Sequence, residues 1–288
     1  MPDQAALGIA VLAGFGALLF VLERAVPLRE AKRALLGRLV VNLAFSALAF
    51  GAAVLLVRPA VEASLGRVTE GPFGLMHLLA LPAALGAVLA FLLMDLSFYY
   101  WHLLNHRVPL LWRFHNVHHI DPDLDVSTAL RFHFGEVAFS AGFRLVQVLL
   151  LGISGWTYLV YELTFQANTL FHHTNLRLPI RLERILNRVL VTPRMHGIHH
   201  SQVERETNSN YGVVFPWWDR LHRTLGLNVP QSAITIGVPG YAEPDDNRLW
   251  HALGLPFRKQ RDYWRRPDGT PVGRDAQLEE TERHRLAE

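Results

Sequence analysis

The sequence predicts an all-α, integral-membrane helical bundle with a cytoplasmic, histidine-rich helical cap. Two observations lead to this fold class: three long stretches lack any Asp, Glu, Lys or Arg, and histidines cluster in four places, in three of them at helical spacing. Half of the 288 residues are hydrophobic and only 18% are charged, which is sparse for a soluble protein. We find no convincing strand pattern, internal repeat or low-complexity tract.

The uncharged stretches are the candidate membrane spans, and they cover residues 4–22, 39–57 and 71–94. Each is long enough to cross a hydrocarbon core of about 30 Å as a helix. A fourth apolar region, residues 137–171, carries only Arg144 and Glu162 and is broken by Gly152-Ile-Ser-Gly155, so it predicts a helical hairpin. The first stretch follows Asp3 instead of a basic segment, which favours a retained anchor over a signal peptide.

Charge asymmetry between the loops predicts the orientation. The first loop is rich in basic residues, whereas the second holds only Arg58 and Arg67; those of the first loop are Arg24, Arg29, Lys32, Arg33 and Arg38. The positive-inside rule places the first loop in the cytoplasm and the N-terminus outside. By parity of the spans, all four histidine clusters then meet on the cytoplasmic face. We therefore expect an integral protein of a bacterial inner membrane with its site facing the cytoplasm.

Four histidine clusters take ten of the fifteen histidines: His102 and His106; His115, His118 and His119; His172 and His173; and His196, His199 and His200. Residues spaced i, i+3 and i+4 share one face of a helix, so each of the three clusters with this spacing can direct its imidazoles to a common point. Neutral imidazole suits iron, zinc, copper or nickel, and one metal rarely takes more than about four protein ligands. Eight or more ligands imply two metals. The competing interpretation, that each histidine merely satisfies its own hydrogen bonds, explains the repeated spacing less well.

Local signals place these clusters on helices. The third span can run on through His106 and end near Pro109, where a helix is interrupted. A new helix from about Leu110 should stop by Asp121-Pro122, and Thr192-Pro193 has the pattern of an N-cap followed by proline at the first helical position.

The order and spacing of these motifs resemble the fatty acid hydroxylase/sterol desaturase superfamily. The resemblance covers about residues 80–225 and rests on these segments: His102-Leu-Leu-Asn-His106-Arg-Val-Pro-Leu-Leu-Trp-Arg-Phe-His115-Asn-Val-His118-His119, Asp125-Val-Ser-Thr, Arg131-Phe-His133-Phe-Gly-Glu136, Thr192-Pro-Arg-Met-His196-Gly-Ile-His199-His200-Ser, Glu206-Thr-Asn-Ser-Asn-Tyr-Gly212 and Trp218-Asp-Arg220. It implies a non-haem diiron oxygenase of the membrane that hydroxylates or desaturates C–H bonds of lipids.

The resemblance implies two iron ions, with O2 as co-substrate, and a ligand set that carries over residue by residue to His102, His106, His115, His118, His119, His196, His199 and His200. His172 and His173 match less cleanly, because related proteins have a His-x3-His near this point and Asn168 stands at the earlier position. We keep both as candidates, with His173 slightly favoured. No catalytic residue beyond the metal ligands is predicted.

Other polar residues have two interpretations. Glu136 and His133 lie in a motif of the resemblance, and a carboxylate that orients a ligating imidazole is expected physically. Asp95, Asp121, Asp125 and Asp219 could serve the same purpose or be ordinary caps and turn residues. His77, His222, His251 and His284 stand alone and are predicted to be non-ligands. The aromatics from Phe98 to Trp101 are predicted to form an interfacial belt.

The electrons must come from elsewhere. The chain has no cysteine, which excludes thiolate-ligated haem, cysteine-bound iron–sulfur clusters and disulfides, and it lacks a Gly-x-Gly-x-x-Gly fingerprint. The expected partners are a membrane lipid as substrate and an electron-transfer protein of ferredoxin, flavodoxin or cytochrome type. Short juxtamembrane basic groups suit lipid headgroups and give no indication of nucleic acid.

Three regions follow from these observations: an N-terminal transmembrane region (1–75), a hydroxylase-like diiron domain (76–225) and a polar cytoplasmic C-terminal tail (226–288). Hydroxylation is favoured over desaturation. The alternatives are an ether-lipid-cleaving monooxygenase of the same superfamily and, from other classes, a bis-His haem electron carrier or a metal-binding structural protein. Haem is disfavoured because the histidines form adjacent triplets at the membrane edge.

Overall fold

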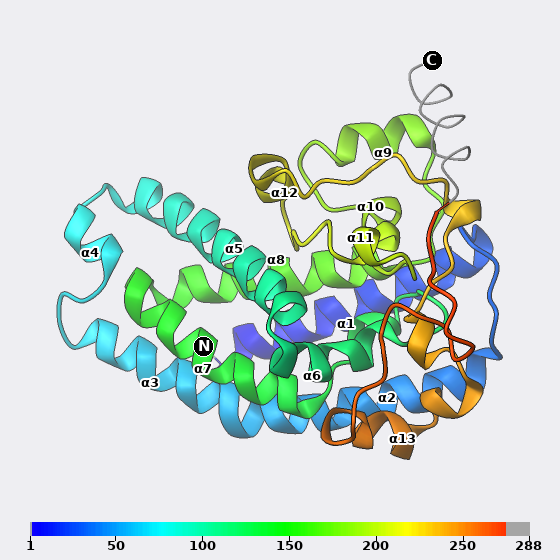
Figure 1. Ribbon diagram of the computed structural model, residues 1–288. Helices are drawn as coiled ribbons and strands as arrows, with labels where there is room; N and C mark the ends of the chain where they lie inside the picture. Colours follow the sequence, from blue (N-terminus) through cyan, green and yellow to red (C-terminus); the bar gives the residue numbers. More distant parts are fainter. Residues whose placement is uncertain (1, 275–288) are drawn as a thin grey trace.

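A computed structural model describes residues 2–274 of the chain. Its long helices lie side by side in a bundle, and most of the short helices gather as a cap toward one end (Figure 1). Only isolated β-bridges occur among these residues, so the all-α prediction is confirmed. The bundle consists of α1 (Pro2–Ala25), α2 (Leu35–Ala52), α3 (Arg58–Thr69), α5 (Ala83–Arg107), α7 (Phe134–Leu151) and α8 (Gly155–His173).

Four helices within residues 2–274 are long and apolar enough to cross a membrane: α1, the continuous helix Leu35–Thr69, α5 and α7. They expose large apolar side chains, among them Leu7, Leu55 and Leu150, which are 66%, 74% and 65% exposed. Apolar surface on this scale favours a hydrocarbon environment, because its exposure to water costs free energy in proportion to its area. The structure thus indicates a membrane-embedded protein.

Two predicted spans have different bounds in the structure. The second continues past Val57 to Thr69, because a π-helical turn (Ala53–Val57) leads directly into α3. This wider turn comes just before Pro59, which cannot donate a regular helical hydrogen bond. The third span starts at Ala83 instead of residue 71, since Pro82 and the left-handed Ala80 separate it from the short α4 (Leu75–Leu79).

The predicted hairpin is present as α7 and α8. Gly152 ends α7 with φ of 66°, and a Cβ at this position would lie 2.2 Å from the carbonyl oxygen of Phe73. Ser154 then caps α8 by accepting a hydrogen bond from the Thr157 amide at 3.1 Å. Glycine is needed at this turn both for the left-handed backbone and for the close approach of the neighbouring loop.

The cap contains α6 (Pro109–His119), α9 (Ile180–Leu186), α10 (Pro193–His199), α11 (Glu204–Thr207) and α12 (Trp217–His222). The predicted helix boundaries at Pro109 and Pro193 are confirmed. Pro109 is the first residue of α6, and Pro193 is the first residue of α10. Thr192 has an extended backbone but makes no side-chain cap. The arginine-rich first connection lies at this same end, because the Leu28 amide donates to the Asn175 carbonyl at 2.7 Å.

The segment after Gly226 was predicted to be a polar tail, yet much of it packs against the cap. Residues 231–257 form short 3-10 turns and α13 (Leu249–Gly254). A single buried cluster joins four residues of this segment to four from the helices: Val238, Tyr241, Ala252 and Leu255 with Phe45, Trp112, Val117 and Ile120. The scattered apolar residues of this polar stretch therefore complete the core beside α6. Residues 275–288, including His284, lie outside the described residues.

The predicted aromatic belt is only partly at the surface. Tyr100 is 44% exposed, but Phe98 and Tyr99 are 3% and 1% exposed. Phe98 packs between Phe143, Tyr161 and Phe165 in the core of the bundle. Successive helical residues point in directions about 100° apart, so a run of four aromatics cannot all face the membrane surface.

Candidate metal centre

Nine of the ten predicted histidines form two adjacent groups among the described residues. Cluster A comprises His102, His106, His115, His119 and His199, and cluster B comprises His118, His173, His196 and His200. Within each cluster, one potential ligand nitrogen from every histidine lies within 4.8 Å of all the others. No carboxylate belongs to either group.

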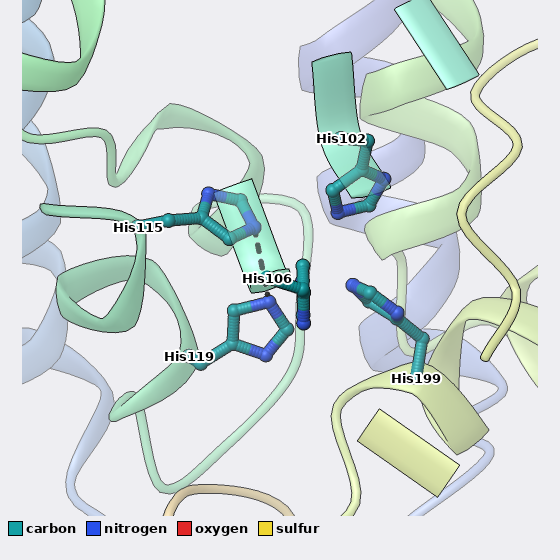
Figure 2. A group of neighbouring side chains, drawn as sticks. All are labelled: His102, His106, His115, His119 and His199. Atoms are coloured by element: carbon teal, nitrogen blue, oxygen red, sulfur yellow. Dashed lines mark hydrogen bonds between the residues drawn. The ribbon is translucent and has the colours of Figure 1, made fainter. Parts of the chain in front are cut away.

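Cluster A is built by α5, α6 and α10 (Figure 2). His102 and His106 lie one turn apart on α5, and His115 and His119 lie one turn apart on α6. The extended Val108 and Pro109 end α5 and start α6 in a new direction. The imidazoles of α6 therefore face those of α5. His199 of α10 closes the group, with its ring centroid 4.6 Å from that of His102.

Cluster B is tighter, and its contacts test whether a metal ion suits it. The Nε2 atoms form a chain from His118 through His173 and His196 to His200, with successive distances of 3.0, 3.0 and 3.1 Å. Each Nε2 carries either one proton or one lone pair in the plane of its ring. The two middle nitrogens would each need to serve two neighbours, so hydrogen bonds cannot satisfy this chain.

A cation accounts for that arrangement. Metal–imidazole bonds of about 2.1 Å at right angles to each other place the two nitrogens about 3.0 Å apart. The observed spacing therefore fits four lone pairs directed at one metal ion. In cluster A the His199 Nε2 and both ring nitrogens of His106 are buried without a protein partner, which is also expected of a metal-binding group.

The outward nitrogens of four histidines are held by the surrounding protein. His102, His173 and His199 direct Nδ1 to the carbonyl oxygens of Tyr211, Thr169 and Ser209, at 2.8, 2.8 and 2.7 Å. A carbonyl only accepts, so each Nδ1 carries the proton and each Nε2 presents a lone pair to its cluster. The peptide chain thus fixes the tautomer that metal binding needs.

Glu136 of α7 orients a fourth imidazole, that of His115. Its Oε1 lies 2.9 Å from Nδ1 of His115, as predicted for an orienting carboxylate. His133 instead caps α7, since its Nδ1 accepts from the Gly135 amide at 3.0 Å, and it belongs to neither cluster.

Burial keeps the cap histidines neutral. It lowers the pKa well below the usual histidine value, and the neighbouring imidazoles lower it further, for His118, His119, His196, His199 and His200. Neutral imidazole is the form that binds metals, so these residues need not lose a proton first.

His172 lies beside cluster B but not in it. Its ring centroid is 4.1 Å from that of His196, while its Nδ1 faces the Asn168 amide nitrogen at 3.4 Å. The Asn168 amide also donates to the Val213 carbonyl. Asn168 therefore joins a hydrogen-bonded support, and the geometry favours His173 over His172 as a ligand.

The four aspartates do not contact the clusters directly. Asp219 accepts from the amides of Tyr211 and Gly212, both at 2.8 Å, and so positions the carbonyl that receives His102. Asp95 accepts from the Trp218 indole at 2.8 Å and anchors the same loop to α5. Asp121 and Asp125 pair with Arg38 at 2.9 and 2.7 Å.

His77, His222 and His251, which are predicted to be non-ligands, lie outside both clusters. His77 and His251 contact backbone carbonyls, and His222 stacks on Tyr99 at 4.7 Å. Sequence reasoning missed the carbonyls of Thr169, Ser209 and Tyr211, because every residue has a carbonyl and no side-chain signal marks the ones used.

Comparison with known proteins agrees with this geometry. Residues 87–224, which contain both clusters, match the family model for fatty acid hydroxylase. The chain contains a fatty acid hydroxylase domain. The resemblance predicted from the motifs is thereby confirmed.

Three relatives of this fatty acid hydroxylase domain illustrate the match. Ornithine lipid hydroxylase OlsE from Rhizobium tropici is 32% identical over 55% of this chain and 47% of its own length. Alkylglycerol monooxygenase from Danio rerio is 34% identical over 68% and 45%, respectively. Human (Homo sapiens) cholesterol 25-hydroxylase is 34% identical over 46% and 48%. The chain thus spans about half the length of these relatives, and no solved structure matches it.

Proposed function

We propose that the chain is a membrane-bound, non-haem diiron oxidoreductase that hydroxylates a C–H bond of a lipid, using O2 and externally supplied electrons. The observation that carries this proposal is the pair of adjacent, all-histidine clusters at one end of an apolar helical bundle. Cluster A would hold one iron and cluster B the other. Bound iron would supply the activation of O2 that attack on an unactivated C–H bond requires.

The protein's own residues prepare this chemistry. Carbonyls of Tyr211, Thr169 and Ser209 orient three imidazoles, and Glu136 orients a fourth. Most ligand candidates are buried, and burial keeps water from competing for a reactive site. The apolar helices would bring an alkyl chain from the bilayer toward the clusters, so positioning would come from the bundle and reactivity from the metals.

Ether-lipid cleavage is a second candidate. The match to alkylglycerol monooxygenase covers 68% of this chain, more than the match to ornithine lipid hydroxylase at 55%.

The alternative of a bis-His haem protein fits the histidine spacing poorly. Axial ligands on opposite faces of a haem iron have nitrogens about 4 Å apart, at about 2 Å per bond. Contacts of 3.0 Å within cluster B leave no room for a macrocycle between the rings.

The reaction can be tested with isotopic oxygen. Membranes containing the iron-loaded protein, incubated with lipid extract, a reductant system and 18O2, should yield a lipid with one labelled oxygen atom. His173→Ala, which removes a cluster B nitrogen, should give no product, while His77→Ala should behave as wild type. Mass spectrometry reads out the label. A product with a new double bond and no label would indicate desaturation, and equal conversion without O2 would rule out both reactions.

Orientation is the second expectation, and we propose that the histidine-bearing end faces the cytoplasm. The basic first connection, with Lys32, lies at that end, and Arg67 lies near the end of α3. The chain has no native cysteine, so Arg67→Cys and Lys32→Cys can be labelled without background. In intact cells an impermeant maleimide should label Arg67→Cys, and it should reach Lys32→Cys only after permeabilisation. The reverse pattern would invert the orientation.

A further inference from the structure

A tryptophan packs against cluster A on the side of the C-terminal segment. Trp112 of α6 is 5% exposed, and its ring centroid lies 4.8 Å from that of His106, 5.3 Å from that of His119 and 6.1 Å from that of His115. This indole therefore contacts three members of one cluster. Trp112 has no role in orienting the metal ligands.

A second tryptophan connects Trp112 to the periphery. Trp264 stacks on Trp112 with ring centroids 5.9 Å apart and planes inclined by 25°, and Tyr263 contacts the same indole at 5.8 Å. Trp264 is itself only partly buried. Its position is fixed by a small turn in which the Arg266 amide donates to the Thr270 carbonyl at 2.9 Å. This segment follows the hydroxylase domain in sequence.

The segment that carries Trp264 is rich in basic residues. Residues 258–266 contain five basic residues and one acidic residue, Asp262. Arg261 is paired with Asp246 at 2.9 Å and Arg265 with Asp262 at 3.6 Å, and Arg258 lines a cavity that also contains Glu243 and Asp245. Lys259 and Arg266 are exposed and lie on either side of the aromatic pair in sequence. A cluster of like charges around a partly exposed aromatic ring favours encounter with an oppositely charged partner.

We propose that residues 258–266 dock an acidic, water-soluble one-electron carrier protein, and that the Trp264–Trp112 contact conducts its electrons to cluster A. The inference rests on the proposed oxygenase function, which needs two external electrons. Each docked carrier is oxidised by one electron and the site is reduced by one, so two encounters supply the pair. The indoles keep their protons and end unchanged, because they bridge the transfer and store no charge.

A second aromatic path leaves cluster A, but it ends elsewhere. Tyr211 contacts His106 at 5.2 Å and Tyr99 at 6.0 Å, and Tyr99 stacks on His222. Tyr99 belongs to α5, a candidate membrane span, and His222 belongs to α12, whose Trp217 and Leu221 are exposed apolar side chains. The Trp264 path instead emerges on a polar segment, which suits a soluble partner.

Docking can be measured apart from catalysis. Protein in nanodiscs is titrated at low salt with a plant-type [2Fe–2S] ferredoxin as the acidic probe. Lys259→Glu with Arg266→Glu should weaken binding at least ~10-fold, because steering and complementarity are reversed. The matched pair Arg181→Glu with Arg184→Glu makes the same charge change on exposed residues of α9 and should bind as wild type. Unchanged affinity in the first pair would overturn the proposal.

A membrane role for the segment gives a different result. Lys259→Cys can be labelled by an impermeant maleimide in discs of zwitterionic or anionic lipid. Equal labelling is expected in both. The carrier site would be refuted if anionic lipid protected Lys259→Cys from labelling and the charge reversal left ferredoxin affinity unchanged. Those results would show that the segment binds lipid headgroups.

Electron transfer is tested with Trp264→Leu and Trp264→Phe in the iron-loaded protein. With photoreduced ferredoxin, the fast phase of site reduction should be lost in the leucine variant and kept in the phenylalanine variant, which retains an aromatic ring. Dithionite should reduce both at the wild-type rate, which controls for an intact site. A fast phase that survives in Trp264→Leu would refute the path. Absence of bound iron or of labelled lipid would refute the proposed function instead, and the ferredoxin titration would still be decisive for docking.

Discussion

Replacement of His199 by alanine is expected to remove about one of two bound metal ions and to lower the rate of lipid oxidation at least ~100-fold. Loss of a group that only orients a metal ligand typically lowers activity by less, about 10- to 100-fold. His118→Ala should do the same from the other side, because His199 belongs to cluster A and His118 to cluster B. Each change leaves the opposite cluster with its own set of nitrogens. The double variant should therefore retain almost no metal.

Elemental analysis of protein expressed with ample iron measures this result. His251→Ala is the matched control, because the Nδ1 atom of His251 bonds the Asp245 carbonyl and the residue lies outside both clusters. Two metal ions retained in both cluster variants would disprove the two-centre arrangement. Zinc in place of iron would leave it intact, since zinc competes well for imidazole ligands.

Replacement of Arg38 by methionine should destabilise the fold by about 3–5 kcal/mol, the usual cost of removing one partner from a buried ion pair. Arg38 of α2 is 8% exposed and binds Asp121, which is completely buried, through two nitrogens at 2.9 Å each. It also donates to Asp125 at 2.7 Å. Burial raises the pKa of Asp121, but Arg38, with a smaller contribution from Arg131, outweighs it and lowers the pKa to about 2. The variant therefore leaves a buried carboxylate without its main counter-charge.

Thermal unfolding in detergent reads out this change, and the same continuous helix offers a control. Arg58 pairs with Glu62 at 2.8 Å, but the two side chains are 70% and 61% exposed. Arg58→Met should cost less than about 1 kcal/mol, as is typical of surface pairs. Equal losses in the two variants would show that the buried network between α2 and the end of α6 does not stabilise the cap.

The sequence was informative wherever one local property decides the structure. Uncharged runs located three of the four membrane-type helices found in residues 2–274, and Pro109 and Pro193 located helix starts. The start of α5 was missed because a criterion based on charge ignores Pro82, which separates α4 from α5 without adding a charge.

The features that the sequence did not predict depend on how distant segments pack together in the fold. The sequence could group His118 with His119, but the structure assigns these neighbours to different clusters. The orientation of α8 likewise brings His173 into cluster B and leaves His172 beside it. The packing of the C-terminal segment was missed because Val238 and Leu255 are isolated apolar residues in a polar stretch, and only the folded cap brings them together.

The division of adjacent histidines between clusters has a mechanical consequence. His118 and His119 lie on α6, and His199 and His200 lie at the end of α10, with one member of each pair in each cluster. Since no carboxylate joins either group among the described residues, covalent backbone sets the distance between the centres. The peptide units of α6 and α10 hold the backbones of the paired histidines at a fixed separation. A change of ligand position in one cluster must therefore come from side-chain rotation or be passed to the neighbouring cluster through these two helices.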